Sequence, residues 1–334
     1  MSQLKRSLLL ALVITAVACQ VAEAGPIHDI VSQVSLASYQ NYLDNCLYTR
    51  LGDNRQSITG AHHDLARDFI RTEFVGFGLT TSLDAFQDGV NVVGVHVGTV
   101  TPNRIYIIGA HYDSISSSDP GSGANAGAPG ADDNASGVAG ILEAARVISQ
   151  YQLEATVMFI AFDREEQVML GSTHYATAHA GDDIRGMLSL DMIAYSGSNP
   201  DKVLLHPGPG SVATRDALAD ALWEYAGIST PTQGQFNWSD HAPFGSFGEG
   251  SCLVIEHDFS SNPHYHRWSD SVDTVGYIDY AYATSITKGV VGYVLDNAIL
   301  VIPEPGTASL AIAGTLGLFI LLGRRTRRGE PAPG

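Results

Sequence analysis

The stretch RIYIIGAHYDS (residues 104–114), together with PGADDNASG (residues 129–137), decides the fold expected for this chain. Its apolar run Ile105–Ile108 predicts a buried strand. His111 and Asp113 follow at the carboxyl end of that strand and stand two residues apart, so on a strand their side chains share a face. A carboxylate beside an imidazole is the arrangement that holds a metal-bound histidine in one tautomer.

The second half of the stretch places two neighbouring acids, Asp132 and Asp133, just before a helix predicted over 136–150. Two carboxylates in a tight glycine-rich turn repel each other unless a cation compensates their charge. A strand, a flexible loop and a helix-capping aspartate would account for the same residues without a metal. Taken alone, the stretch leaves both interpretations open.

Apolar runs and helical periodicity alternate along the rest of the chain. The strands predicted from them are 93–97, 105–111, 156–162, 187–190 and 252–256, and the helices are parts of 25–50, 59–77, 136–150, 212–226 and 276–300. Residues 156–162 read TVMFIAF, a run typical of a strand covered on both faces. The sequence therefore predicts an α/β fold, with a central, mostly parallel mixed sheet and helices on both faces. No linker or internal repeat divides residues 25–302, so one domain is expected there.

Two local features add detail to this prediction. The helix over 59–77 is predicted from apolar residues at helical spacing, namely Leu65, Ala66, Phe69, Ile70 and Phe74. The pair Pro102-Asn103 is expected to turn the chain into the strand that ends at His111.

The formal net charge of −17 over 334 residues argues against nucleic acid as a partner. Of the three cysteines, Cys19 lies in a segment that we expect to be removed. Cys46 and Cys252 are too few for a disulfide framework, although they could form one bridge in an oxidising compartment.

Both ends of the chain look like targeting segments. Residues 1–24 combine Lys5 and Arg6, an apolar run and the small-residue sequence Ala22-Glu23-Ala24, which predicts a signal peptide cleaved before Gly25. Residues 303–334 begin with Pro-Glu-Pro, continue with an apolar run and end with four clustered arginines.

This C-terminal order resembles the PEP-CTERM sorting signal of Gram-negative bacteria. The resemblance implies export to the cell envelope, the cell surface or the outside, with signal peptidase and exosortase as processing partners. The tail would contact the membrane before processing, with its arginines on the cytoplasmic side. A plain tail anchor is the alternative.

The candidate site residues all follow predicted strands, and ligands of such sheets bind beyond the carboxyl ends of the strands. They are His111, the pair Glu165 and Glu166 in FDREE, Asp191 in LSLDMIAY and His266 in NPHYHRWSD. Each alone could be a helix-capping acid, a surface glutamate or a core histidine. Their joint placement at one edge of the sheet favours a functional site.

The segments HYDS, PGADDNASG, FDREEQ, LDMIAY, SDHAPF and YHRWSD, in this order, resemble the di-zinc aminopeptidases of metallopeptidase family 28. The resemblance covers roughly residues 30–300 and implies the zinc aminopeptidase (phosphorylase/hydrolase-like) fold. It implies that His111 and Asp191 bind one zinc, that Glu166 and His266 bind the other, and that Asp133 bridges the two.

The resemblance also settles which neighbouring acid is expected to act. Asp133 is preferred over Asp132, because the bridging acid of the family stands directly before the residue that precedes Ala-Ser-Gly. A cis peptide bond is implied between Asp133 and Asn134, and Asp113 is implied to orient His111.

The chemistry of such a site agrees with these residue types. Two zinc ions about 3.5–4 Å apart need a shared carboxylate, with a histidine and an acid on each side. They lower the pKa of a bridging water toward ~7, and a carboxylate must then take its proton. Glu165 is expected to be this general base, because in extended backbone it points away from its neighbour Glu166.

Several positions depart from the family pattern or leave a choice open. Val168 stands where the family has glycine, so the turn after the glutamate pair is in doubt. The oxyanion-stabilising tyrosine of some members falls near Phe236-Asn237 here. His257 and His264 are alternatives to His266, and Asp240 and His241 in SDHAPF are expected to act behind the ligands or in the fold.

The expected protein is an exported zinc aminopeptidase that hydrolyses the N-terminal residue of peptides with a free amino terminus. A glutaminyl cyclase, which the same fold supports with one zinc, is the alternative enzyme. An inactive metal-binding surface domain is the alternative from another class.

Overall fold

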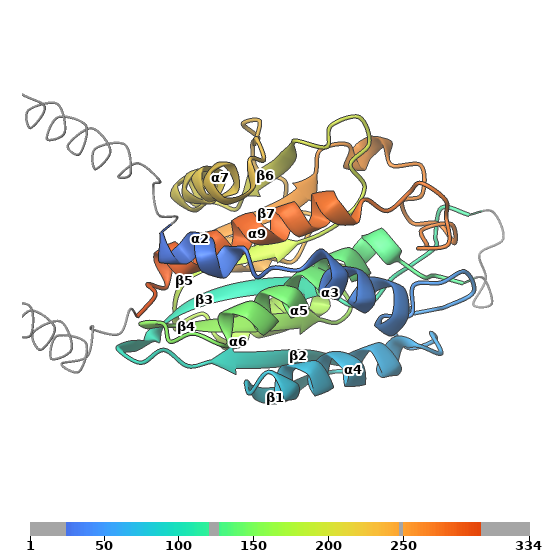
Figure 1. The fold of residues 1–334 in the computed structure, drawn as a ribbon. Coiled ribbons are helices and arrows are strands. Elements are labelled where there is room, and N and C mark those ends of the chain that lie inside the picture. The colour runs from blue at the N-terminus through green and yellow to red at the C-terminus, as the bar shows by residue number, and fades with distance from the viewer. Residues whose placement is uncertain (1–24, 120–126, 247–249, 302–334) are drawn as a thin grey trace, which may run out of the picture. The chain divides into compact units, whose positions relative to one another are not determined.

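The computed structural model describes residues 25–119, 127–246 and 250–301 (Figure 1). The predicted signal segment 1–24 and sorting tail 303–334 lie outside these residues. Among the described residues, no helix combines the length and apolar character needed to cross a membrane.

A seven-stranded mixed sheet forms the centre, in the order β1-β2-β4-β3-β5-β7-β6. The strands are β1 Thr80–Phe86, β2 Gly89–His96, β3 Thr101–His111, β4 Ala155–Phe162, β5 Asp183–Leu190, β6 Val203–Pro207 and β7 Ser251–Glu256. The four central strands β4, β3, β5 and β7 run parallel, whereas β1, β2 and β6 join by antiparallel pairing. The predicted α/β fold is confirmed, and its parallel part is the centre of the sheet.

Helices cover both faces of this sheet (Figure 1). One face packs against α2 Pro26–Val31, α3 Leu36–Asn41, α4 His63–Gly76, α5 Gly137–Ile148, α7 Val212–Ala226 and α9 Tyr280–Asn297. The other face packs against α6 Leu170–Ala178 and α8 His241–Ser246. Along β4, Val157 and Phe159 face the first layer and Ile160 and Phe162 the second. Double coverage explains why the β4 sequence is apolar at almost every position.

Helix α4 begins at His63, four residues later than predicted. The preceding residues fold back on themselves, since the N–H of Gly60 bonds to the carbonyl of Gln56 at 2.8 Å and that of His62 to Asn54 at 2.9 Å. Leu65 is 48% exposed, so it lies at the margin of the apolar stripe. The buried apolar face of the helix consists of Ala66, Ile70 and Phe74.

The chain does not turn at Pro102-Asn103, because β3 already begins at Thr101. The pairing of β3 with β4 shifts register between Thr101 and Ile105. A proline has no N–H to donate, and an irregularity of this kind is where a strand tolerates it. The turn lies earlier, at residues 97–100.

The disulfide that the sequence left open is not formed between the two cysteines in the described part of the chain. Cys252 is buried in β7, Cys46 lies in the short π-helical turn Tyr42–Cys46, and both thiols are free.

Candidate metal centre

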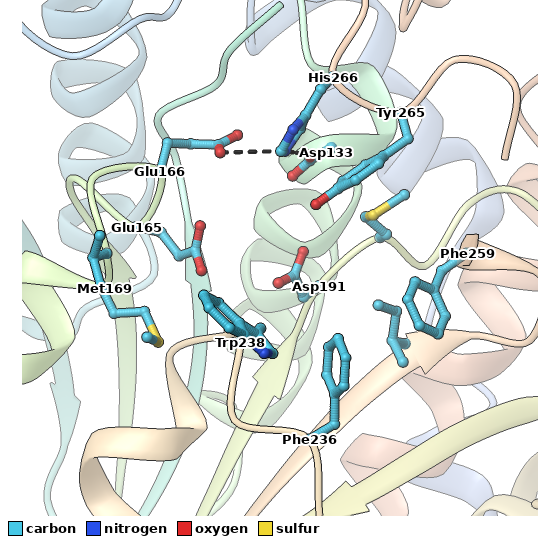
Figure 2. Close-up of a pocket in the computed structure, with 13 residues that line it drawn as sticks. Asp133, Glu165, Glu166, Met169, Asp191, Phe236, Trp238, Phe259, Tyr265 and His266 are labelled. Carbon is cyan, nitrogen blue, oxygen red and sulfur yellow. Dashed lines mark ion pairs between the residues drawn. The ribbon is translucent and has the colours of Figure 1, made fainter. Parts of the chain in front are cut away.

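The candidate ligands meet where the parallel strands end. His111 is the last residue of β3, Glu166 follows β4 and Asp191 follows β5 directly. Because parallel strands end at the same edge of a sheet, their separate positions in the sequence become one site. Asp133 comes from the turn before α5, and His266 from the loop after β7 (Figure 2).

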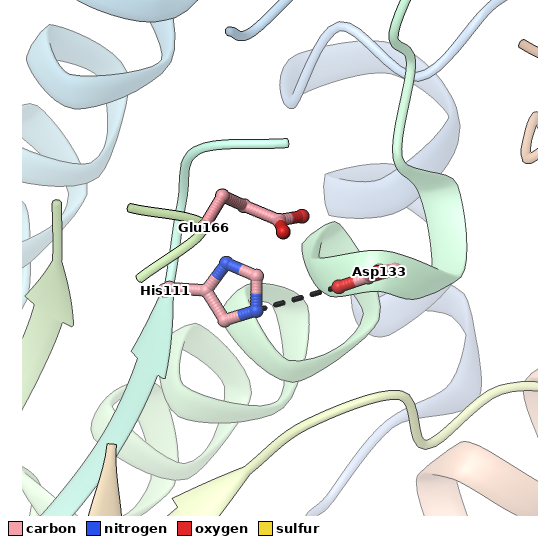
Figure 3. A group of neighbouring side chains, drawn as sticks. All are labelled: His111, Asp133 and Glu166. Atoms are coloured by element: carbon pink, nitrogen blue, oxygen red, sulfur yellow. Dashed lines mark ion pairs between the residues drawn. The ribbon is translucent and has the colours of Figure 1, made fainter. Parts of the chain in front are cut away.

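Asp133 stands between two histidines and offers one carboxylate oxygen to each. Its Oδ1 lies 3.4 Å from Nε2 of His111, and its Oδ2 lies 3.2 Å from Nε2 of His266 (Figure 3 shows the first contact). Asp191 Oδ1 is 3.5 Å from His111 Nε2, and Glu166 Oε2 is 3.3 Å from His266 Nε2. The structure therefore brings all five predicted residues together, with Asp191 beside His111 and Glu166 beside His266.

The donor set fits metal ions. Ligand atoms of His111, Asp133 and Glu166 all lie within 4.8 Å of one another. The second carboxylate oxygen of Glu166 is buried without a hydrogen-bond partner among the described residues, as expected for an oxygen that binds a cation. Burial raises the pKa of Glu166 to about 7, with the charge of Asp133 adding to it. Neighbouring buried carboxylates of this kind need a compensating positive charge.

The choice between the two neighbouring acids is decided by their contacts. Burial acts to raise the pKa of Asp133, but the hydrogen bonds and charges of His111 and His266 hold it well below its ordinary value. The Asp132 carboxylate turns away from them and accepts hydrogen bonds from the backbone N–H of Ala194 at 2.8 Å and from Asn262 at 3.0 Å. The expected cis peptide bond between Asp133 and Asn134 is present.

The two alternative histidines, His257 and His264, form hydrogen bonds with residues outside the proposed ligand set. His257 Nδ1 is 2.8 Å from Asp258, and His264 Nδ1 is 2.9 Å from the hydroxyl of Ser269. Asp270, four residues after His266, accepts backbone N–H groups from Asp132 and Asp133 at 2.7 and 3.0 Å. It thereby fixes the turn that presents Asp133.

Asp113 contacts more than the predicted histidine. Nδ1 of His111 lies 3.1 Å from the Asp113 carbonyl oxygen and 3.4 Å from its carboxylate. The carboxylate also accepts the backbone N–H of Glu165 at 3.1 Å and of Glu166 at 3.3 Å. Asp113 therefore orients the histidine and holds the backbone of the glutamate pair.

Glu165 lines the cavity beside the ligands, with Oε2 at 3.9 Å from His111 Nε2. Its backbone is not extended as expected, because a tight turn from Arg164 to Met169 follows β4. Burial raises the pKa of Glu165; His111 opposes the rise, and Asp240 adds to it. The side chain nevertheless lies apart from Glu166 in Figure 2. Asp240 and His241 are buried at the start of α8, behind the site.

Val168 has a φ of 67°, in the left-handed region where glycine is favoured, and its side chain is 73% exposed. We expect Val168→Gly to raise the free energy of unfolding by about 1 kcal/mol, because relief of the strained β-branched residue exceeds the entropy cost of glycine. Chemical denaturation measures the change. Val212→Gly, at the exposed first residue of α7, is the control and should not stabilise the protein, because Val212 has no positive φ to relieve.

The cavity of about 200 Å³ above these acids has an apolar wall that the sequence analysis did not predict. The wall residues are Val168, Met169, Met192, Phe236, Trp238, Ile255 and Phe259. Tyr265 also lines the cavity, with its hydroxyl toward Asp133 and Asp191 in Figure 2. In the sequence, only the position of Tyr265 directly before the proposed ligand His266 indicated that it could lie at the site. Phe236 offers no hydrogen-bond donor, and Asn237 is not among the lining residues.

Comparison with known proteins identifies a peptidase family and relatives that are named as aminopeptidases. A family model described as "Peptidase family M28" matches residues 91–294. The probable aminopeptidase YDR415C of Saccharomyces cerevisiae is 35% identical over 208 residues, which cover 58% of this chain and 54% of the yeast protein. Aminopeptidase YwaD of Bacillus subtilis is 29% identical over 213 residues, which cover 59% of this chain and 43% of YwaD. The chain thus spans about half the length of the curated relatives it matches.

Solved structures agree on the fold. BSAP, a zinc aminopeptidase from Bacillus subtilis, aligns with a TM-score of 0.54 and 27% identity, over 64% of this chain and 52% of BSAP. Legionella pneumophila LapA aminopeptidase aligns with a TM-score of 0.67 and 20% identity, over 84% of this chain and 76% of LapA. A Bacteroides thetaiotaomicron glutaminyl cyclase aligns with a TM-score of 0.63 and 18% identity, over 78% of this chain and 97% of the cyclase. At these last two identities the likeness concerns the fold alone.

Proposed function

The chain belongs to peptidase family M28, and on this basis we propose that it is a zinc-dependent aminopeptidase acting on the N-terminal amide bond of peptides. The observation that carries the proposal is the position of Asp133, with one oxygen toward each of two histidines and Glu165 free beside them. Support also comes from the relatives named as aminopeptidases and from BSAP, which is named as a zinc enzyme.

In this proposal His111 and Asp191 would hold one zinc ion, Glu166 and His266 would hold a second, and Asp133 would contribute a ligand to both. When bound, the ions would polarise the scissile carbonyl and make water more acidic. Glu165 takes the proton of the attacking water and returns it to the leaving amine. The raised pKa of Glu165 favours this exchange, because it makes the carboxylate a stronger proton acceptor than an ordinary glutamate.

The cavity provides places for the substrate. Its apolar wall, which includes Met192, Phe236 and Phe259, can receive the side chain of the N-terminal residue. The carboxylates at its base suit a free α-amine, and an N-acetylated peptide should therefore not be cleaved.

In this proposal Tyr265 stabilises the oxyanion, the role that a tyrosine near positions 236–237 has in some members of the family. Burial raises the pKa of its hydroxyl, and the charges of Asp133 and Asp191 raise it further, so the group keeps its proton. A protonated phenol that points into the cavity can donate a hydrogen bond to the oxygen on which negative charge develops.

We expect Tyr265→Phe to lower kcat by about 10²-fold, because it removes one donor to the transition state. KM and zinc content should change little, since the ring and the ligands remain. Steady-state kinetics and metal analysis test this, with Tyr225→Phe as the control, whose hydroxyl bonds to Asp296 outside the site. An unchanged kcat in Tyr265→Phe would remove this residue from the mechanism.

The experiment that tests the function offers leucyl-nitroanilide and a glutaminyl peptide to the zinc-loaded protein, with and without a chelator. The proposal expects release of nitroaniline, loss of this activity with chelator, and two zinc ions per chain. Accumulation of pyroglutamate without nitroaniline would instead identify a glutaminyl cyclase. No turnover of either substrate by the zinc-loaded protein would favour the inactive metal-binding domain.

A further inference from the structure

A row of polar side chains runs from the candidate metal centre into the N-terminal part of the chain. It leads from His111 to Asp113, then through Ser57 to Asp163, and ends at His63. Ser57 and His63 precede the family-matched region, which begins at residue 91. They are only 8% and 7% exposed, and neither has a place in the mechanism proposed above.

Ser57 stands between two buried carboxylates. Its Oγ lies 3.0 Å from Oδ1 of Asp163 and 3.3 Å from Oδ2 of Asp113. A serine hydroxyl has one proton and can donate it to only one acceptor at a time. The two carboxylates therefore compete for this proton.

His63 influences the outcome of this competition. Its Nε2 lies 2.8 Å from the same Asp163 oxygen that Ser57 contacts, and a carboxylate partner requires this nitrogen to donate. The other oxygen of Asp163 accepts the backbone N–H of Val90 at 2.9 Å. Because His63 and Val90 also donate to Asp163, this carboxylate does not depend on the Ser57 proton alone, and loss of the His63 donor changes how that proton is shared between Asp163 and Asp113.

We infer that Ser57 and His63 are positioning residues that act through Asp113 on His111 and on the glutamate pair. Asp113 is fully buried and accepts the backbone N–H groups of Glu165 and Glu166. Loss of one of its donors changes how this carboxylate is held, and with it the orientation of a ligand histidine and of the base. The inference rests on the proposed function, because it assigns these residues to the zinc site.

The test uses the full-length protein and substitutions that separate hydrogen bonding from packing. Ser57→Ala removes the hydroxyl. His63→Phe removes the N–H but keeps an aromatic ring beside Tyr112, whose ring centroid lies 4.8 Å away. His63→Gln keeps an N–H donor and serves as the conservative variant. Thr287→Val is the matched control, since it removes a buried hydroxyl from α9.

Two readouts are measured for each variant: zinc affinity, by competition with a fluorescent chelator, and kcat and KM at saturating zinc. Partners that orient metal ligands typically change metal affinity or activity 10–100-fold when removed. We therefore expect Ser57→Ala and His63→Phe to weaken zinc binding by about 10-fold or more and to lower kcat with KM unchanged. His63→Gln should stay close to the parent, and Thr287→Val should change neither readout.

The double variant Ser57→Ala/His63→Phe adds a further check. If both residues act through Asp113, the double variant should resemble Ser57→Ala, because linked residues have non-additive effects. Additive losses would contradict the shared route.

The possible failures are distinguishable. If the parent binds zinc while both single variants keep its zinc affinity and kcat, the inference is overturned and the proposed function stands. If the parent binds no zinc, the proposed function fails and this inference fails with it. Should His63→Phe not fold, Ser57→Ala decides the question alone, since it removes a single oxygen atom.

Discussion

Glu165→Gln is expected to lower kcat by about 10³–10⁴-fold, near the upper limit for loss of a general acid–base group. Glutamine is almost isosteric with glutamate, but its amide cannot accept the proton of the attacking water. Glu165 contacts the site only at 3.9 Å from His111, so the five proposed ligands keep their places in this variant. Zinc content should therefore equal that of the parent.

Steady-state kinetics on leucyl-nitroanilide and metal analysis of the same sample measure both parts of this prediction. Glu224→Gln is the matched control, because that glutamate pairs with His28 at the surface, at 3.0 Å. Near-normal turnover by Glu165→Gln would exclude it as the base. A loss of zinc together with activity would instead make Glu165 a ligand.

The site could be predicted largely because it is built on strand ends. His111 and Asp191 stand directly at or after apolar runs, and the carboxyl ends of parallel strands meet at one edge. The choice of Asp133 over Asp132 and of His266 over two other histidines needed the family resemblance. Local pattern alone does not tell which of two neighbouring acids faces the site.

The contacts that sequence reasoning missed join segments that are far apart in the chain. Ser57 reaches Asp163 across 106 positions, and no periodicity or motif reports such a pair. The expected extended backbone at Glu165 was wrong for a related reason, since the turn after β4 is set by residues with positive φ, including Val168. A β-branched residue gives no sequence signal for that conformation.

Missed strands and shifted boundaries have a simpler physical cause. Strand β1, Thr80–Phe86, lies at the edge of the sheet and is mostly exposed, so it lacks the apolar run that marked the central strands. Strand β6, Val203–Pro207, is buried but only five residues long. By contrast, the helix predicted over 212–226 was found at those residues, with Gly227 in the left-handed conformation after its end.

Asp133→Asn is expected to have the most severe effect on metal binding, because among the described acids Asp133 alone contacts both histidines of the site. Asparagine keeps the size of the side chain but replaces one ligand oxygen by an NH₂ group, which cannot bind a cation, and removes the negative charge. The two proposed zinc ions then share no carboxylate. Since metal ions contribute several kcal/mol of charge stabilisation, kcat/KM should fall by about 10³-fold or more.

Metal analysis after zinc dialysis, together with kcat/KM on leucyl-nitroanilide, measures this prediction. Asp191→Asn provides the comparison, because Asp191 contacts only His111 among the two histidines. It should weaken one zinc position, whereas Asp133→Asn should weaken both. If Asp133→Asn retains two zinc ions per chain with the affinity of the parent, Asp133 is not the shared ligand. In that case the short contacts of its carboxylate with His111 and His266 serve only to orient the two rings.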